Sequence, residues 1–591
     1  MLKLFMESKN DGKLPQNSLL VPKTQIPFNL TSIQIMISNL KLKFGRTPNA
    51  EPEDIPVPPI TVFVGPNNSG KSKVISEIAA FCHSGTQHHN TLILENLTFE
   101  DTSEENTLDA IEKYTIPLVP GEMLSPGHIF FGSARGRNQV NIELLKKFIM
   151  TPQANNQAYC QWFLTHAILM LDGSSRINLI HEQAAGDLQQ PPQSSFQVLL
   201  RDDAKRHEVR RIIHEAFDTN FVIDPTFLGR LRIRLSERPP TDNMEERGIH
   251  TEAVAFHSKA QPIDLASDGV KAFTGIITEL IAGDPRVVLI DEPEAFLHPS
   301  LASKLGLEIS RAALSENKRV FVSTHSPAFV MGCVHSGAPV NIIRLTYRGG
   351  VATSRVLPSK DILELMRNPL LRSTGVLSGL FYEFVVVTES DADRAFYQEV
   401  NERLLRFTKG HGIPNCLFIN AQNKQTIQTI IRPLRQLGIP AAGIVDIDVL
   451  KDGGSTWTSM LTSMNVPEIS HNSLAAMRVS VKQAMEATGK NMKRDGGIEI
   501  LNPGEKEAAK NLLNQLAEYG MFTVPKGELE SWLPHTNATG HGPSWLIEVF
   551  KKMGEDPASA DYIKPSSGDV WEFISKIRSW HFDANRKGIP L

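Results

Sequence analysis

A glycine-rich loop between an apolar strand and a helix is the feature that most constrains this chain. Ile60–Val64 is a β-branched and aromatic run typical of a buried strand, and residues 72–81 have helical periodicity. The sequence between them, Gly-Pro-Asn-Asn-Ser-Gly-Lys-Ser, fits the phosphate-binding pattern Gly-x-x-x-x-Gly-Lys-Ser/Thr. There, backbone N–H groups cradle phosphates, Lys71 reaches the β and γ phosphates, and Ser72 ligates Mg²⁺. The pattern predicts an ATP site formed by Gly65, Asn67, Asn68, Ser69, Gly70, Lys71 and Ser72.

A second segment supplies acids for the same site. The sequence Arg-Val-Val-Leu-Ile-Asp-Glu-Pro-Glu at residues 286–294 predicts a buried strand that ends in two carboxylates. We expect Asp291 to hold the Mg²⁺ through water and Glu292 to polarise the attacking water as general base. His325 follows another apolar strand, at residues 320–323, and is a candidate sensor of the γ phosphate.

The order of these motifs resembles the ATP-binding-cassette (ABC) branch of P-loop ATPases, which includes the heads of SMC, RecF and Rad50 proteins. In that family a Ser-Gly signature precedes the second acidic motif and caps the nucleotide of the opposite subunit. Ser267 and Gly269, in Leu-Ala-Ser-Asp-Gly-Val-Lys, are the matching residues, although the usual form is Leu-Ser-Gly-Gly. Residues 35–44 are similar to the first strand of those heads. The resemblance implies a homodimer or larger assembly with ATP between the heads.

A cluster of acids lies far downstream. Glu389 stands at the end of a predicted strand at residues 381–388, and Asp393 follows one turn later, where a helix begins. Asp446 and Asp448 are two residues apart in another apolar strand, so they project from one face. The carboxyl edge of a parallel sheet is where ligands bind. Four carboxylates there would repel one another unless cations neutralise them, which predicts a site for Mg²⁺ or Mn²⁺ beside a phosphodiester.

The spacing of these acids resembles the Toprim fold of topoisomerases, DnaG-type primases and OLD-family (overcoming lysogenization defect) nucleases. Toprim domains usually have Gly after the first glutamate, where this chain has Ser390. Fusion of such an ATPase to a C-terminal Toprim domain is characteristic of the OLD family. Residues 521–533 are similar to the segment that supplies another metal-site glutamate, which implies Glu530, with Glu528 next. The resemblance also implies a basic residue that stabilises the transition state, either Lys576 or Lys587.

The length of 591 residues requires several structural units. We expect an α/β fold with an ABC-type ATPase head at residues 1–375 and a Toprim domain, a parallel sheet with flanking helices, at 376–591. Residues 85–255 are expected to form an insertion in the head that serves dimerisation or substrate contact. Two basic segments there, at residues 130–137 and 203–215, are candidates for phosphate or DNA contact, and solvated surface is the alternative for each.

Composition narrows the setting. No apolar stretch approaches the roughly 20 residues that span a bilayer, and the N-terminal residues 1–27 lack a secretion signal, so we expect a cytoplasmic protein without membrane contact. The four cysteines are far apart, which argues against zinc and disulfides. The net charge of -4 means that nucleic-acid contact requires local basic patches.

Together these features predict an ATP-regulated, metal-dependent DNA endonuclease. The resemblance to the OLD family implies a role in bacterial anti-phage defence, like Gabija-type and retron-associated systems, with a partner protein or RNA possible in such systems. Two alternatives remain open. One is a RecF-like repair ATPase whose Toprim domain only binds nucleic acid, and the other is a Toprim ribonuclease that acts on tRNA or other RNA.

Overall fold

The central sheet forms around β3 (Ile60–Val64), whose residues are all buried. In this computed structural model, which describes residues 37–118, 121–133, 136–373 and 375–590, β3 runs parallel to both of its neighbours, as its continuous apolar sequence predicts. The six-stranded order is β15-β14-β3-β13-β12-β7, with only β15 antiparallel to its neighbour. The other strands are β7 (Ile168–Leu171), β12 (Val287–Asp291), β13 (Arg319–Ser323), β14 (Val340–Arg348) and β15 (Val351–Pro358).

Helices cover both faces of this sheet. Phe63 of β3 packs with α1 (Lys71–Ser84) on one face, whereas Val62 and Val64 join a larger core on the other. That larger core includes α11 (Asp268–Ala282), α12 (Pro299–Ser315) and α13 (Pro327–His335). The alternation along β3 therefore builds two cores from one strand.

A small antiparallel sheet of order β2-β1-β4 contacts α1 and completes its apolar cover. Its strands are β1 (Ile37–Leu42), β2 (Asp54–Pro56) and β4 (Leu94–Phe99). β1 occupies most of the segment that we compared with the first strand of ABC heads, and Ile35 and Met36 lie outside the described residues.

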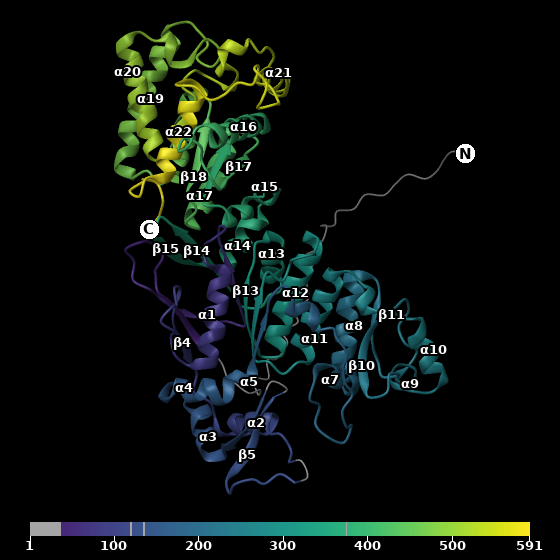
Figure 1. Cartoon of the computed structure of the whole chain (residues 1–591). Helices are drawn as coiled ribbons and strands as arrows, with labels where there is room; N and C mark the ends of the chain where they lie inside the picture. Colours follow the sequence, from purple (N-terminus) through teal and green to yellow (C-terminus); the bar gives the residue numbers. More distant parts are fainter. Residues whose placement is uncertain (1–36, 119–120, 134–135, 374, 591) are drawn as a thin grey trace, which may run out of the picture.

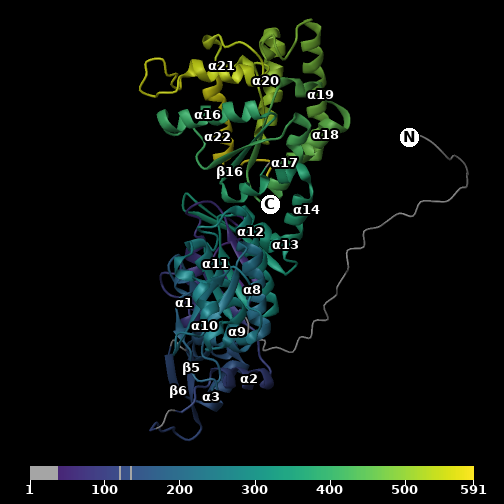
Figure 2. The ribbon, with the colours of Figure 1, turned by 90° about the vertical axis from the view of Figure 1, so that its right-hand side faces the viewer.

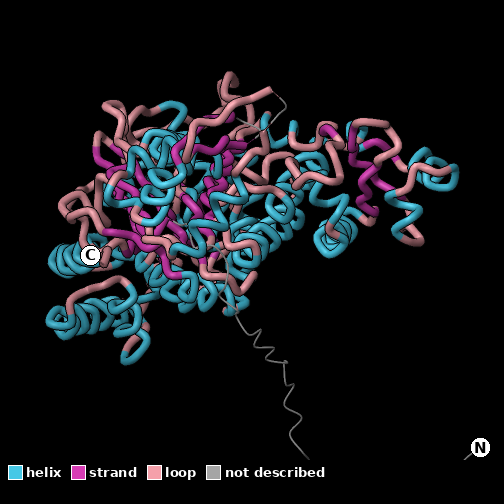
Figure 3. Tube along the Cα trace, turned by 90° about the horizontal axis from the view of Figure 1, so that it is seen from below, coloured by secondary structure: helices cyan, strands magenta, loops and turns pink. Residues whose placement is uncertain are grey.

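After β4, most of the expected insertion at residues 85–255 forms two excursions separated by β7, and the second continues to Pro262. The first contains α2 (Glu104–Tyr114), β5 (His128–Ser133), β6 (Gly136–Asn141), α3 (Ile142–Met150), α4 (Asn156–Tyr159) and α5 (Thr165–Ala167). After β7 and α6 (Ser175–Asn178), the second excursion projects sideways from the head (Figures 1 and 3). It contains β8 (Gln183–Ala184), α7 (Ser195–Arg201), α8 (Asp203–Phe217), β9 (Asn220–Asp224), β10 (Arg230–Ser236), α9 (Asn243–Arg247), α10 (Thr251–Lys259) and β11 (Gln261–Pro262).

The described arginines of the two basic segments form contacts within the protein. Arg206 of α8 is fully buried and donates to Glu246 at 2.9 Å. Arg137 donates through both terminal nitrogens to the Glu122 carboxylate and lies over the Phe130 ring. These contacts favour a structural role for both side chains, and Arg135 lies outside the described residues.

The C-terminal domain is built on a parallel sheet of order β17-β16-β18-β19. Its strands are β16 (Phe384–Thr388), β17 (Cys416–Asn420), β18 (Ala441–Val445) and β19 (Met521–Thr523). One face packs with α16 (Asp391–Phe407), α21 (Pro543–Met553) and α22 (Asp569–Phe582), and the other with α17 (Lys424–Gln436). Before β19 the chain forms α18 (Gly454–Ser463), α19 (Glu468–Ala487) and α20 (Pro503–Glu518).

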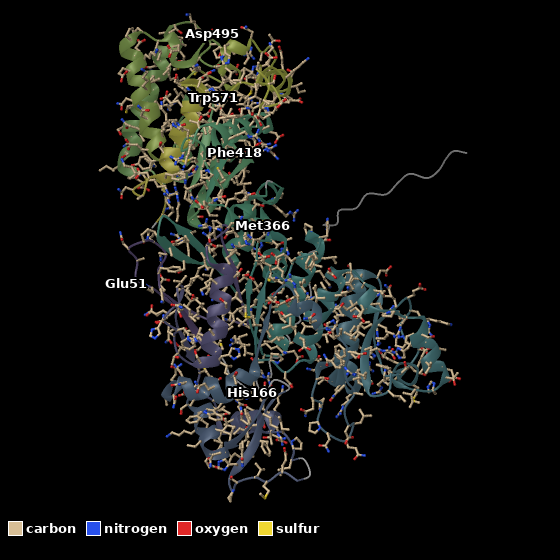
Figure 4. The ribbon with its side chains drawn as sticks, in the orientation of Figure 1. Glu51, His166, Met366, Phe418, Asp495 and Trp571 are labelled. Atoms are coloured by element: carbon tan, nitrogen blue, oxygen red, sulfur yellow. The ribbon has the colours of Figure 1, made fainter. Side chains whose placement is uncertain are left out.

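The two domains stack end to end (Figures 1 and 2). They are joined by α14 (Ser359–Arg367), by α15 (Pro369–Ser373) and by a 3₁₀ segment, Val376–Phe381. Met366, labelled in Figure 4, marks α14 at this junction. Arg344 of β14 is buried at the junction and donates to the carbonyls of Tyr382 at 2.9 Å and Leu380 at 3.3 Å. The head sheet thus holds the chain directly before β16.

Candidate functional site

The phosphate loop has the strand-loop-helix setting that the sequence predicts. Gly65 has φ 145°, and a Cβ there would lie 2.1 Å from the Leu345 carbonyl oxygen, so only glycine fits. Lys71 is buried, and its ammonium donates to the Gly65 and Pro66 carbonyls at 2.9 and 2.8 Å. Burial lowers the pKa of Lys71 to about 8, against the opposing charges of Glu292, Asp291 and Glu294. Asn67, Asn68 and Ser72 are exposed, whereas Ser69 is buried and Gly70 forms the N-cap of α1.

The acids after β12 face this loop because β13 lies between β3 and β12, and all three strands end at one edge. The Ser323 hydroxyl donates to Asp291, and the Glu292 amide donates to the Ser323 carbonyl at 2.9 Å. His325 Nε2 lies 3.6 Å from Glu292 Oε1. Burial, and next the Lys71 charge, lower the pKa of His325. The structure therefore brings Lys71, Asp291, Glu292 and His325 together.

Two further residues order this edge, and our sequence analysis assigned neither. Glu294 accepts hydrogen bonds from the Thr324 hydroxyl at 2.7 Å and the His325 amide at 2.8 Å, and burial raises its pKa. Arg176 is buried and donates to the carbonyls of Asp291, at 3.0 Å, and Glu292. The guanidinium thus fixes the backbone that carries both acids. Glu294 could have been found from the Asp-Glu-Pro-Glu sequence at residues 291–294, whereas Arg176 belongs to no recognisable motif.

Replacing Arg176 with methionine should slow ATP hydrolysis about tenfold, because the lost charge-assisted hydrogen bonds no longer position Glu292. ATP affinity should change much less, since Lys71 and the loop are untouched. Steady-state hydrolysis and equilibrium ATP binding measure the two effects separately. The matched control is Arg311→Met, which removes an arginine that is half exposed on α12. Equal turnover in the two variants would contradict the positioning role.

The Ser-Gly signature lies at the start of α11. Ser267 is exposed and caps the helix, and Gly269 packs so tightly that a Cβ would lie 2.7 Å from the Phe296 carbonyl oxygen. Leu265 and Phe296 beside it are 72% and 65% exposed. Together with Ser267 they form an outward face beside the segment that carries the acids.

The downstream acids meet at the carboxyl edge of the second sheet. Glu389 follows β16 and Asp446 follows β18, and Glu389 Oε1 accepts the Asp446 amide at 2.8 Å. The Asp393 carboxylate accepts from the Ser390 amide and hydroxyl at 2.9 and 2.7 Å, in a capping box that starts α16. Burial raises the pKa of Glu389 to about 8 and that of Asp446 to about 7, and neighbouring carboxylates add to both shifts.

Asp448 differs from the expectation. β18 ends at Val445, and the chain turns into a 3₁₀ segment, so Asp446 and Asp448 do not share a strand face. Asp448 lies 3.2 Å from the Lys424 ammonium, whereas Asp446 lies 2.7 Å from that of Lys493. The short apolar run before Asp446 predicts a strand, but the sequence pattern does not show that the strand ends at Val445.

A second acidic group adjoins the first. Ligand atoms of Glu528, Glu530 and His541 lie within 4.8 Å of one another. Glu530 accepts from the Gly542 amide at 2.7 Å and lies 2.7 Å from His541 Nδ1. Burial, and then the charge of Glu530, raise the pKa of Glu528. Glu530, our sequence choice, and Glu528 therefore lie together, and His541 is a member that the sequence did not indicate.

The basic residue beside Asp446 and Glu528 is Lys493. Its ammonium lies 2.7 Å from Asp446 and 3.8 Å from Glu528. Lys576 and Lys587, the residues that the resemblance implied, pair instead with Glu572 at 3.3 Å and Glu518 at 2.5 Å. Lys493 lies in the segment between α19 and α20, where no motif marks it.

A Lys493→Met variant should bind Mn²⁺ about tenfold more tightly, because a positive charge that repels the cation is removed. If the acids form a nuclease site, cleavage by the same variant should also fall at least about tenfold, since an ammonium beside them would stabilise charge on a phosphate. Calorimetry and a cleavage assay measure the two effects. Lys490→Met, which removes an exposed lysine from the same segment, is the control. Unchanged cleavage would show that Lys493 pairs with the acids but does not act on the phosphate.

The acidic groups fit a divalent cation. Among the residues that the structure describes, Asp448 Oδ1 and Glu528 Oε2 are buried carboxylate oxygens with no hydrogen-bond partner. Such oxygens are costly unless a cation or water satisfies them. Carboxylate oxygens are also the ligands that Mg²⁺ and Mn²⁺ prefer.

Comparison with known proteins supports the ATPase. Residues 187–331 match the family described as "AAA domain, putative AbiEii toxin, Type IV TA system". This match includes the signature, the β12 acids and His325, and together with the phosphate loop it supports an ATPase site. No curated protein sequence matches the chain.

Similar solved structures include an Smc head bound to the C-terminal winged-helix domain of ScpA, at 12% identity and a TM-score of 0.31, covering 56% of this chain and 99% of that one. The SMC head domain from Thermotoga maritima matches at 12% identity and a TM-score of 0.27, covering 54% and 98%. The Smc head domain derived from Pyrococcus furiosus matches at 12% and 0.30, covering 56% and 99%. Among the described residues, no helix is long and apolar enough to cross a membrane.

Proposed function

We propose that this protein is an ATP-regulated, divalent-metal-dependent DNA endonuclease of the OLD type. The observation that carries the proposal is the convergence of Glu389, Asp393 and Asp446 at one sheet edge, next to Glu528 and Glu530. Lys493 pairs with Asp446 and Glu528, and His541 with Glu530, whereas the described residues form no ion pair with Glu389 or Asp393. We further propose that residues 376–591 form a Toprim domain and residues 1–375 the ATPase head.

The acids would hold Mg²⁺ or Mn²⁺, with Glu389, Asp393, Asp446, Asp448 and Glu530 as ligands and Glu528 as a further one. A cation bound there supplies a nucleophilic water at neutral pH and stabilises the leaving oxygen of a phosphodiester. The Asp393 carboxylate is oriented by Ser390, and the Glu389 carboxylate by the Asp446 amide. Lys493 would lie against the negative phosphate.

ATP control is supported by the junction of the domains. A cavity of about 330 Å³ is lined by Asn67 and His325 of the head and by Phe381, Tyr382 and Asn415 of the segment around the second sheet. The His325 and Phe381 rings are 6.3 Å apart. A shift of His325 on ATP binding would therefore reach the chain that leads into β16. We propose that dimerisation of the heads around ATP gates access to the acids.

The biological role that we propose is anti-phage defence in the cytoplasm, with DNA as substrate. The description of the matched family names a putative toxin of a type IV toxin–antitoxin system, which is in keeping with an effector role. Digestion of supercoiled plasmid, linear DNA and tRNA side by side, with Mg²⁺ or Mn²⁺, tests the substrate. Cleavage of DNA supports the proposal, and cleavage of RNA alone would replace it with a ribonuclease. Binding without cleavage of any substrate would favour a repair ATPase.

The affinity for Mn²⁺ should rise steeply between pH 6 and pH 8. Because the pKa values of Asp446 and Glu389 are raised to about 7 and about 8, both carboxyls carry protons at pH 6 and lose them over this interval. The cation binds the ionised forms, so affinity should increase by roughly 100-fold. Calorimetry in buffers of different ionisation enthalpy measures the affinity and the released protons together. A Mn²⁺ affinity that does not change with pH would contradict the raised pKa values of Asp446 and Glu389.

A further inference from the structure

A group of three residues beside the acids of the sheet edge differs from them in chemistry. Glu528, Glu530 and His541 place ligand atoms within 4.8 Å of one another, and in the described part of the chain no other group of His, Cys, Asp or Glu does so. We call these three residues the His541 group. It offers an imidazole nitrogen together with carboxylate oxygens. Imidazole suits Zn²⁺, Cu²⁺, Fe²⁺ and Ni²⁺, whereas carboxylate and water suit Mg²⁺, Ca²⁺ and Mn²⁺.

Glu528 brings a buried oxygen that lacks a hydrogen-bond partner. The residue is 6% exposed, and within the described ranges its Oε2 atom accepts no hydrogen bond. The Lys493 ammonium is 3.8 Å from this oxygen and pairs more closely with Asp446, at 2.7 Å. Burying a carboxylate oxygen without a partner is costly. This atom therefore points to a ligand that supplies positive charge.

The backbone around His541 holds the imidazole against Glu530. His541 Nδ1 lies 2.7 Å from Glu530 Oε1, which also accepts the Gly542 amide at 2.7 Å. The His541 amide donates to the Ser544 hydroxyl at 3.1 Å, and this hydroxyl donates to the His541 carbonyl at 2.9 Å, in the first turn of α21. Hydrogen bonds of this kind orient the ligands of a metal ion.

Little movement brings the three ligands onto one ion. Ligand atoms of a tetrahedral ion at about 2.1 Å lie about 3.4 Å apart, so a spread of 4.8 Å closes by rotation of the side chains. His541 is exposed, and α21, which follows it, lies at the end of the C-terminal domain that faces away from the head (Figures 1 and 2). Solvent therefore reaches the group, and three protein ligands leave a fourth position for water.

We propose that the His541 group binds a transition-metal cation of the Zn²⁺ class, separate from the Mg²⁺ or Mn²⁺ at Glu389, Asp393 and Asp446. With the same ligands Zn²⁺ binds more tightly than Mn²⁺, and a nitrogen donor adds to its advantage over Mg²⁺. The Glu530 carboxylate has two oxygens, so it can serve both cations. The group contains no cysteine, so the wide spacing of the four cysteines does not bear on it. The inference concerns cation binding and stands whether or not the acids cleave a phosphodiester.

The test is a calorimetric titration of the full chain with Zn²⁺ in excess Mg²⁺, so that Mg²⁺ occupies the acids of the sheet edge. Wild type should bind one Zn²⁺ per chain. His541→Ala and Glu528→Gln should each weaken this binding by about 100-fold or more, because each removes a direct ligand. The control is His535→Ala, which removes an exposed imidazole six residues earlier. Visible absorption of Co²⁺, used in place of Zn²⁺, reports the loss of the nitrogen ligand independently.

The outcomes separate this site from the proposed nuclease. The affinity for Mn²⁺ should be unchanged in His541→Ala, and Asp446→Asn should still bind Zn²⁺. Equal Zn²⁺ affinity in His541→Ala and His535→Ala, or displacement of all Zn²⁺ by excess Mg²⁺, would overturn the proposal. Thermal melting checks that every variant is folded. Absence of DNA cleavage by a wild type that binds Zn²⁺ at His541 would count against the nuclease and would leave this site standing.

Discussion

Lys71→Ala should lower the affinity for ATP by about 100-fold or more, because this buried ammonium, which donates to the Gly65 and Pro66 carbonyls, is the charge that the phosphate-loop pattern uses to bind the β and γ phosphates. Glu292→Gln should behave differently. It keeps the loop intact and removes the general base, so ATP still binds while hydrolysis slows by about 10²- to 10⁴-fold. Equilibrium ATP binding and steady-state hydrolysis distinguish the two variants.

The Glu292→Gln variant should also accumulate as a closed dimer in the presence of ATP, which light scattering coupled to size exclusion detects. Lys73→Ala is the matched control for Lys71→Ala, since Lys73 is exposed in the first turn of the same helix. ATP hydrolysis at the wild-type rate by Glu292→Gln would contradict the assignment of Glu292 as the general base. Normal hydrolysis by Lys71→Ala would place the nucleotide elsewhere.

Asp446→Asn should abolish Mn²⁺ binding and cleavage while ATP hydrolysis continues. Asp446 touches both Glu389 and Lys493, and the amide cannot replace the charge that binds the cation. Loss of a direct ligand should weaken Mn²⁺ by about 100-fold or more, since changes in outer-shell partners alone cost 10- to 100-fold.

Asp452→Asn is the control for this variant, because Asp452 lies in the same segment and pairs with Lys424 rather than Lys493. The two variants separate the metal site from general stability. Loss of ATP hydrolysis in Asp446→Asn would mean that the domains do not act independently. Full Mn²⁺ affinity in Asp446→Asn would remove this carboxylate from the metal site.

Sequence patterns predicted the parts of each site that lie at the ends of apolar strands. β3, β12 and β13 are continuous apolar runs, and a parallel sheet gathers their carboxyl ends at one edge, so Lys71, Asp291 and His325 could be placed together from the chain alone. The same logic placed Glu389 and Asp446. The apolar pattern is enough to place the ends of these strands, because a buried parallel strand must be apolar along its whole length.

Residues that act through tertiary contact were not predictable in this way. Arg176 reaches the backbone of Asp291 from α6, and Lys493 reaches Asp446 from the loop between α19 and α20. A single arginine or lysine in a polar loop is usually exposed, so nothing local separates these two from the rest. Lys576 and Lys587 show the converse, because both pair with nearby acids of the surface.

The most direct test of the account is a plasmid cleavage assay with Mg²⁺ or Mn²⁺, with and without ATP, that compares wild type, Asp393→Asn and Glu292→Gln. We predict metal-dependent cleavage by wild type and loss of cleavage in Asp393→Asn. The cleavage rate of wild type should differ with and without ATP. With ATP, Glu292→Gln should cleave at the rate of the ATP-bound protein. Cleavage that persists in Asp393→Asn, or that is the same with and without ATP in every variant, would contradict an ATP-gated nuclease at these acids.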